Sequence, residues 1–134
     1  MTSLPCARLA SLALTFLVAF MSGHAAGEAA PPAASEVITR VNRAATHADY
    51  VALRADMIQE FRWSFGGDAS AEQAIAEWKR QPENLRQLAR ITGAKCAYRK
   101  DKTVECPAGA GTSFRAGFTA AGGRWKMAYF IGGD

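Results

Sequence analysis

The residues that could carry proton-transfer chemistry lie close together. His47 is the single histidine after residue 25, and Asp56 and Glu60 follow it, four residues apart. Histidine titrates near neutral pH, and a carboxylate that faces a pocket can gain a raised pKa and act as a general base. The structural alternative makes His47 a polar cap between two helices, and the carboxylates solvated charges near Arg54 and Arg62. We favour the structural alternative and expect no catalytic residue, and we keep Asp56 as a candidate for lining a pocket.

Four aromatic side chains could line a site for an apolar ligand, because aromatic rings combine a large contact area with a polar edge. They are Trp63, Trp78, Trp125 and Tyr129. The alternative is that they fill the core of a small domain, and we expect that role for most of them, with Trp63 and Tyr129 as the first pocket candidates. Arg62 and Arg115 are polar residues on two expected strands. Such an arginine would bind an anion if it pointed inward, and would be solvated if it pointed outward.

Other chemistries lack their sequence patterns. Only one of the two histidines, His47, lies outside the predicted signal peptide. This excludes a multi-histidine metal site and the Glu-x-x-His pair of di-iron proteins, so we expect no metal. No Gly-x-Ser-x-Gly motif and no phosphate-binding glycine-rich loop with lysine occur, so we expect no cofactor. The net charge is +4, with basic and acidic residues scattered along the chain. Because basic and aromatic residues do not interleave in a stripe, we expect no nucleic-acid partner.

The N-terminal segment is typical of a secretory signal peptide. Arg8 precedes the apolar run Leu9–Met21, and the small residues Gly23 and Ala25 follow it. The run is too short to span a bilayer, and small residues at these positions suit a signal peptidase. We predict a signal peptide over residues 1–25, a periplasmic or secreted protein, and no stable membrane insertion after cleavage. An uncleaved anchor is the alternative.

The cysteines agree with export. One of the three lies in the predicted signal peptide, which leaves Cys96 and Cys106. An even pair in an oxidising compartment predicts a disulfide. If the two cysteines face each other in a hairpin, Tyr98 faces Val104 and residues 100–102 form the turn. A directly opposed pair of this kind brings the α-carbons close enough for the bond.

Helical signals fill the first two thirds of the expected domain, residues 35–134, after an Ala/Pro-rich lead-in at 26–34 that we expect to be disordered. Four helices are predicted. The first is Glu36–Thr46 with Ser35 as its cap, and the second opens at Asp49 and has Tyr50, Leu53 and Met57 on one face. The third is Ala71–Arg80 after a capping box at Ser70, and the fourth runs from Pro82 to a glycine cap at Gly93. The length suits one domain.

Alternating side chains predict the strands. Phe61–Phe65 alternates aromatic and polar residues, and the Cys96–Cys106 hairpin follows the helices. In the last strand, alternation places Trp125, Met127, Tyr129 and Ile131 on one face, after a turn at Ala121-Gly122-Gly123. The order of elements predicts an α+β fold, in which a curved antiparallel sheet of about five strands packs against the N-terminal and middle helices.

Two segments resemble the nuclear transport factor 2-like superfamily, which includes ketosteroid-isomerase-like and SnoaL-like proteins. His47–Met57, running into Phe61–Phe65, is similar to its short second helix and the strand that follows, and Gly123–Ile131 is similar to its closing strand. The chain departs from the family between Ala71 and Thr92, where many members place a strand and a single helix. The resemblance implies a cone-shaped cavity between sheet and helices that serves small ligands, catalysis or dimerisation.

Three functional hypotheses follow. The first is an exported, non-catalytic domain that binds a small apolar or amphipathic ligand in the cone-shaped cavity. The second is an isomerase- or cyclase-type enzyme of the ketosteroid-isomerase-like class that uses Asp56 or His47. The third is a cell-envelope interaction module, in which the outer sheet face or the basic Lys95–Lys102 hairpin meets a partner. A homodimer through the sheet face is compatible with each of them.

Overall fold

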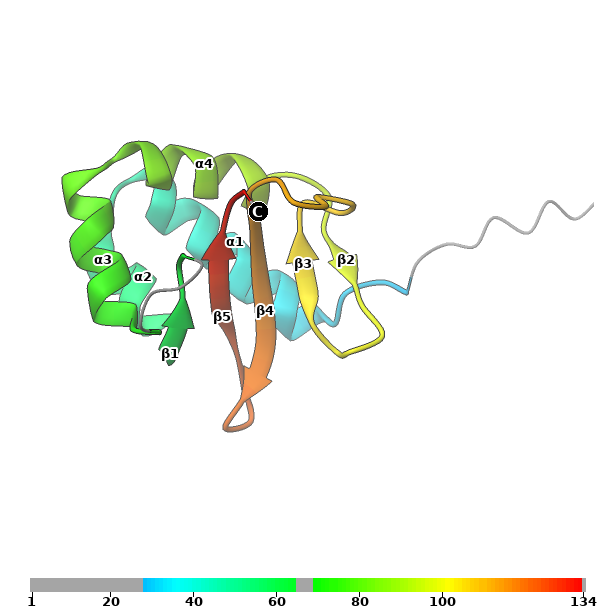
Figure 1. The fold of residues 1–134 in the computed structure, drawn as a ribbon. Helices are drawn as coiled ribbons and strands as arrows, with labels where there is room; N and C mark the ends of the chain where they lie inside the picture. The colour runs from blue at the N-terminus through cyan, green and yellow to red at the C-terminus, as the bar shows by residue number, and fades with distance from the viewer. Residues whose placement is uncertain (1–27, 65–68, 134) are drawn as a thin grey trace, which may run out of the picture.

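The structure is a computed structural model that describes residues 28–64 and 69–133. The predicted signal peptide and Phe65, the end of the predicted strand at 61–65, lie outside the described residues. The elements in chain order are α1 (Pro32–Thr46), α2 (Tyr50–Ala55), β1 (Met57–Arg62), α3 (Ala71–Arg80), α4 (Glu83–Thr92), β2 (Ala97–Tyr98), β3 (Val104–Cys106), β4 (Arg115–Ala121) and β5 (Arg124–Ile131) (Figure 1). None of the helices in this part of the chain is long and apolar enough to cross a membrane.

The strands form one five-stranded sheet in the order β1-β5-β4-β3-β2. The predicted α+β fold with five strands is confirmed. The sheet is mixed, however, because β1 runs parallel to β5, while the other neighbours are antiparallel. Helices α3 and α4 and three strands separate β1 from β5, which is enough chain for a parallel pairing. At the start of the pair, the Met127 backbone N–H donates to the Asp56 carbonyl at 2.7 Å.

The helices cover one face of the sheet. Figure 1 looks onto the opposite face, which carries no helix, with α1 passing behind the strands. Side chains between the two layers are fully buried: Leu53, Met57, Phe61, Val104, Phe118 and Met127. This interior is filled by the protein's own side chains.

Helix α1 begins earlier than predicted. It starts at Pro32, with Pro31 as its cap, and Ser35 makes no cap. Proline suits the first helical turn, because its missing N–H would have no partner there. Ala34 is fully buried in the core, so packing favours the extra turn. The predicted disordered lead-in at 26–34 is therefore wrong for its last residues.

The boundary between α2 and β1 also differs from the prediction. Asp49 caps α2 as predicted, and its carboxylate accepts a hydrogen bond of 3.0 Å from the Ala52 N–H. The helix ends at Ala55, before Met57, which begins the strand. Met57 lies opposite Met127 in the sheet and is fully buried. Pairing with β5 thus turns the predicted end of a helix into a strand.

Helices α3 and α4 follow the sequence closely. The Ser70 hydroxyl accepts a hydrogen bond of 3.3 Å from the Gln73 N–H, which confirms the predicted cap. Gly93 follows α4 as predicted, but its φ is −82°, so it does not form the left-handed cap. A Cβ at this position would lie 3.3 Å from the Ala89 carbonyl oxygen and 3.4 Å from Nδ2 of Asn42, so the site leaves little room for a side chain.

The disulfide hairpin is confirmed. Cys96 and Cys106 are bonded, with their α-carbons 4.3 Å apart. Tyr98 lies opposite Val104, as the pairing predicts. The Lys102 N–H donates to the Arg99 carbonyl at 3.0 Å and closes the predicted turn.

The final hairpin matches the prediction at its turn and departs from it along β5. Gly122 and Gly123 both take positive φ, 57° and 75°, as a two-residue hairpin turn requires. Further along, Gly117 pairs with Tyr129 and Phe118 with Met127, so that Ala128 is an extra residue, a β-bulge.

The bulge reverses the alternation of β5. Met127 points into the core, whereas Tyr129 lies on the helix-free face, where it hydrogen-bonds to Glu105. The predicted common face of Trp125, Met127, Tyr129 and Ile131 is therefore wrong beyond Ala128.

Candidate functional site

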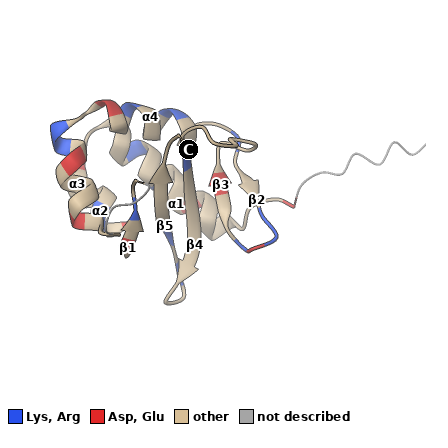
Figure 2. Cartoon of the chain, viewed as in Figure 1, with Lys and Arg blue, Asp and Glu red and all other residues tan. Residues whose placement is uncertain are grey.

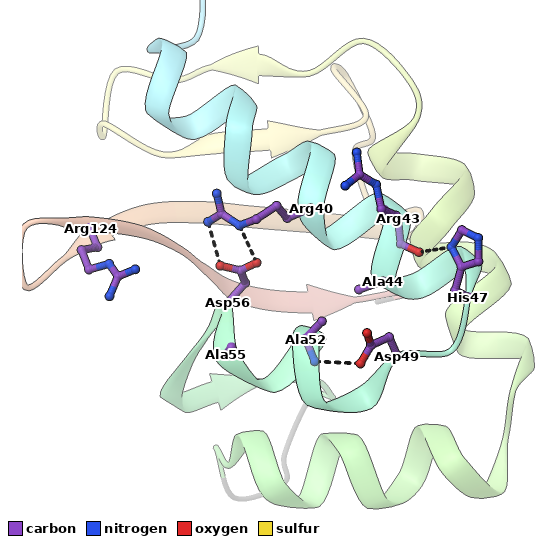
Figure 3. A pocket seen from close by; sticks show the side chains of 9 residues that line it. All are labelled: Arg40, Arg43, Ala44, His47, Asp49, Ala52, Ala55, Asp56 and Arg124. Atoms are coloured by element: carbon purple, nitrogen blue, oxygen red, sulfur yellow. Dashed lines mark hydrogen bonds and ion pairs between the residues drawn. The ribbon is translucent and has the colours of Figure 1, made fainter.

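An open groove of about 740 Å³ lies between α1 and α2 (Figure 3). We call it the α1–α2 groove. Its lining residues are Arg40, Arg43, Ala44, His47, Asp49, Ala52, Ala55, Asp56 and Arg124. Three arginines and a histidine therefore share this surface with two aspartates and three alanines.

Helical spacing brings the α1 residues to the groove. Arg40, Arg43, Ala44 and His47 fall at positions i, i+3, i+4 and i+7, which lie on one face of a helix. From α2 come the cap Asp49, the alanines and Asp56, and Arg124 comes from the first position of β5. The methyl groups of Ala44, Ala52 and Ala55 provide the groove's apolar surface.

Arg40 and Asp56 form a two-point ion pair in the groove. Arg40 Nε and Nη2 donate to the two Asp56 carboxylate oxygens at 3.0 and 2.8 Å. The Asp56 side chain is 15% exposed and that of Arg40 is 51% exposed. The hydrogen bond from the guanidinium to Asp56 raises the pKa of Arg40 above its ordinary value, and the guanidinium stays charged. Because both carboxylate oxygens are engaged, Asp56 neutralises Arg40 and links α1 to the end of α2.

The other acid–base groups of the groove also have partners. The Asp49 carboxylate caps α2. Nδ1 of His47 lies 2.8 Å from the Arg43 carbonyl oxygen. Since a carbonyl oxygen only accepts, this geometry assigns the proton to Nδ1 and leaves Nε2 toward solvent. His47 thus closes the C-terminal turn of α1, as the structural alternative predicted.

Two guanidinium groups of the groove are not engaged in this way. Within residues 28–64 and 69–133, the structure gives the side chains of Arg43 and Arg124 no hydrogen bond and no ion pair. Both residues are exposed. With Arg40 matched by Asp56 and Asp49 turned to a helix end, the groove presents two open cations beside an apolar surface. Such a surface suits a small ligand that carries an acidic group.

The four predicted aromatic candidates do not all meet in one cavity. Trp78 is 2% exposed, and its ring packs edge-on against Phe61 and Phe130 at centroid distances of 5.7 and 5.8 Å. Trp125 is partly buried against the core. Both positions match the core role that was the alternative for these residues.

Trp63 and Trp78 lie together on a second cavity, the aromatic cleft, of about 400 Å³. Its other lining residues are Ser64, Glu77, Gln81, Asn84, Phe114, Phe130 and Gly132. The Trp63 Nε1–H is buried and has no acceptor in the described part of the chain. Because that atom is sealed from the surface, a ligand in the cleft would have to displace its surroundings to reach it. The aromatic cleft is therefore a weaker candidate than the α1–α2 groove.

Tyr129 and Arg62 lie on the helix-free face, away from both cavities. The Tyr129 hydroxyl donates to Glu105 at 2.5 Å, and the Arg62 guanidinium stacks on the Tyr129 ring at 5.1 Å from its centroid. Burial, followed by the bond to Glu105, raises the pKa of Tyr129 above its ordinary value. On β4, Arg115 donates to the Ser113 carbonyl at 3.1 Å.

The helix-free face carries a polar cluster of Tyr129, Glu105, Arg99 and Arg62. Figure 2, in the same view as Figure 1, shows basic residues at the turn between β2 and β3 and at the end of β1. Val51, the large hydrophobic residue that stands out as exposed in the described part, lies on α2 and not on this face. An apolar docking patch on the sheet, which would have favoured an envelope interaction module, therefore has no support here.

Sequence reasoning identified Asp56 but overlooked the cations around it. The signal was present in α1, because Arg40, Arg43 and His47 recur on one helical face. Arg124 could not be added from the sequence, since its place beside α1 depends on how the final hairpin docks.

Comparisons with known proteins add no relative. No family model, no curated protein and no solved structure matches this chain. The resemblance to the nuclear transport factor 2-like superfamily stays a prediction.

Proposed function

We propose that this chain is an exported, non-catalytic binding protein that holds a small amphipathic ligand with an acidic group in the α1–α2 groove. The observation that carries the proposal is the pair of open guanidiniums, Arg43 and Arg124, which line the groove together with alanine methyl groups. An amphipathic acid matches both features, because its acidic group can bind an arginine while its apolar part covers the methyl groups.

The proposal places the ligand in this surface groove and not inside a cone. The layer between sheet and helices contains Leu53, Phe61 and Phe118, each fully buried. Native cores are packed to the density of organic crystals, which leaves few spaces larger than a water molecule. The groove between α1 and α2 is therefore the better place for a small ligand.

Binding is favoured over catalysis by the partners of the acid–base groups. Both Asp56 oxygens accept from Arg40, the Asp49 carboxylate caps α2, and His47 Nδ1 bonds to a backbone carbonyl. A general base must offer a lone pair to the substrate proton at hydrogen-bonding distance. Both Asp56 oxygens are already engaged by Arg40, and the lone pair of His47 Nε2 faces solvent.

Export is supported by two independent features. The segment before residue 26 has the charge, apolar run and small residues of a signal peptide. The Cys96–Cys106 disulfide suits an oxidising compartment such as the periplasm or the extracellular space.

Native mass spectrometry of the protein purified from its own compartment, without refolding, tests the proposal. We expect an added mass that disappears on denaturation. Ala55→Leu should reduce it strongly, because Ala55 is an exposed groove residue and leucine fills the space while suiting a helix. Lys100→Gln, on the β2–β3 turn and not among the groove's lining residues, is the control and should retain the added mass. The proposal would be contradicted if the wild-type protein carried no added mass, or if Ala55→Leu left the added mass unchanged.

A further inference from the structure

The open cations of the α1–α2 groove stand at its two ends, and this separation restricts the shape of the ligand. Resting on the proposed function, we infer that the groove takes an elongated ligand with an acidic group at each end, of the class of α,ω-dicarboxylates. The inference concerns the ligand's two ends and the length between them.

The first end is formed by the last turn of α1. Arg43 and His47 lie four residues apart on the same helical face, and the His47 Nδ1 bond to the Arg43 carbonyl leaves Nε2 toward solvent. The Arg43 guanidinium makes no ion pair within the described residues. An acidic group at this end can therefore take Arg43 as its principal partner.

The second end is formed by Arg124. This residue is the first of β5 and follows the Gly122-Gly123 turn. In Figure 3 it lies beyond the Arg40–Asp56 pair, on the side away from Arg43 and His47. Because Arg40 is already matched by Asp56, an acidic group here would bind Arg124.

The helix gives the length of the α1 side of the groove. Arg40 and His47 are two turns apart on α1, about 10 Å at a rise of 1.5 Å per residue, and Arg124 lies beyond Arg40 (Figure 3). Ala44 and Ala52 lie between the Arg40–Asp56 pair and His47, Ala55 lies beside Asp56, and each offers only a methyl group (Figure 3). A chain of methylene groups fits this stretch, whereas an acidic group placed midway would meet Arg40, whose charge Asp56 already matches.

Isothermal titration calorimetry tests the inference directly on the mature wild-type protein. The probes are α,ω-dicarboxylates from succinate to dodecanedioate, each compared with the monocarboxylate of equal chain length. We expect affinity to peak at an intermediate dicarboxylate and to exceed that of its matched monocarboxylate roughly tenfold, because one charge-assisted contact is added.

Two variants assign the ends. Arg43→Gln and Arg124→Gln should each lower the affinity of the best dicarboxylate about tenfold, to the level of its monocarboxylate, and leave the monocarboxylate less affected. Lys100→Gln also removes one positive charge, at a residue that does not line the groove, and should change the affinity of neither the dicarboxylate nor the monocarboxylate. Circular dichroism should show unchanged folding, since neither arginine side chain has a partner in the described part of the chain.

The failures of the two proposals can be distinguished. Equal affinity for dicarboxylates and monocarboxylates, or no length preference, would overturn the two-ended ligand. The absence of any binding in the calorimetric series would also overturn the two-ended ligand. In that case, an added mass in native mass spectrometry that Ala55→Leu reduces would still support the groove as a binding site. An added mass that Ala55→Leu does not change would instead overturn the proposed function.

Discussion

The Tyr129 hydroxyl donates a hydrogen bond of 2.5 Å to the Glu105 carboxylate and reaches across a whole strand to do so. Tyr129 stands on β5 and Glu105 on β3, with Gly117 of β4 between them. The ring lies over Gly117, where a Cβ would come within 2.1 Å of it. Glu105 is 8% exposed and also accepts a bond of 2.9 Å from Arg99. Gly117 thus provides the space in which the two side chains meet.

Gly117→Ala is expected to destabilise the protein by about 2 to 3 kcal/mol. The added methyl overlaps the Tyr129 ring, and moving the ring costs packing energy as well as the bond to Glu105. Urea unfolding of the variant and the wild type measures the difference. Thr119→Ala, two residues along the same strand, is the control. A Gly117→Ala loss below about 0.5 kcal/mol would show that the ring moves without cost.

Tyr129→Phe is expected to make stability less dependent on alkaline pH. The folded-state pKa of Tyr129 is raised above the ordinary 10.0 by burial and by Glu105, so its contribution is complete below that pH and is lost as pH rises through the folded-state value. The free energy of unfolding of the wild type should therefore approach that of Tyr129→Phe above pH 10. Near neutral pH, loss of the bond to a charged acceptor should cost about 1.5 to 3 kcal/mol. Parallel curves from pH 8 to 11 would contradict this reasoning.

The position of Tyr129 shows where sequence reasoning ends in this chain. Alternation located β5, and the two glycines located its turn, because both signals are local. The bulge at Ala128 is not encoded by any local residue preference, and it arises from how β4 and β5 pair. One inserted residue reverses every later side chain, so a pocket candidate became part of the helix-free face.

The groove likewise combines a feature that a local sequence signal predicts with features that depend on tertiary contacts. The α2 cap at Asp49 could be read from the sequence, because it concerns residues three apart. The Arg40–Asp56 pair spans 16 residues and requires the docking of two helices. The parallel pairing of β1 with β5, which fixes the end of α2, is likewise a tertiary contact without a local signal.

Removal of the disulfide with Cys96→Ala and Cys106→Ala is expected to cost about 2.5 to 3 kcal/mol. The bond closes a loop with a sequence separation of 10, and a short loop restricts the unfolded chain by about this amount in the chain-entropy model. Denaturant unfolding of the double variant measures it, with reduced wild-type protein as the comparison. If the oxidised, reduced and double-variant proteins unfold at the same midpoint, the cross-link adds nothing to stability.

Breaking the Arg40–Asp56 pair from either side is expected to move ligand binding in opposite directions. Asp56→Asn leaves Arg40 as a third open cation. The groove should therefore bind sebacate, the ten-carbon member of the dicarboxylate series, more tightly by roughly threefold to tenfold. Arg40→Gln leaves an unmatched carboxylate and should weaken binding by a similar factor. Each variant should lose about 1 kcal/mol of stability, since the pair is partly exposed.

Calorimetry with sebacate and urea unfolding of the same samples separate these effects. A purely structural role for the ion pair predicts that both variants bind less well, because each loosens α1 from α2. Opposite changes in affinity at similar losses of stability require that the charge of the groove itself attracts the ligand. Glu83→Gln removes a carboxylate that pairs with Arg86 on α4, outside the groove, and should leave sebacate affinity unchanged. If Asp56→Asn and Glu83→Gln raised the affinity equally, net charge and not the groove would account for binding.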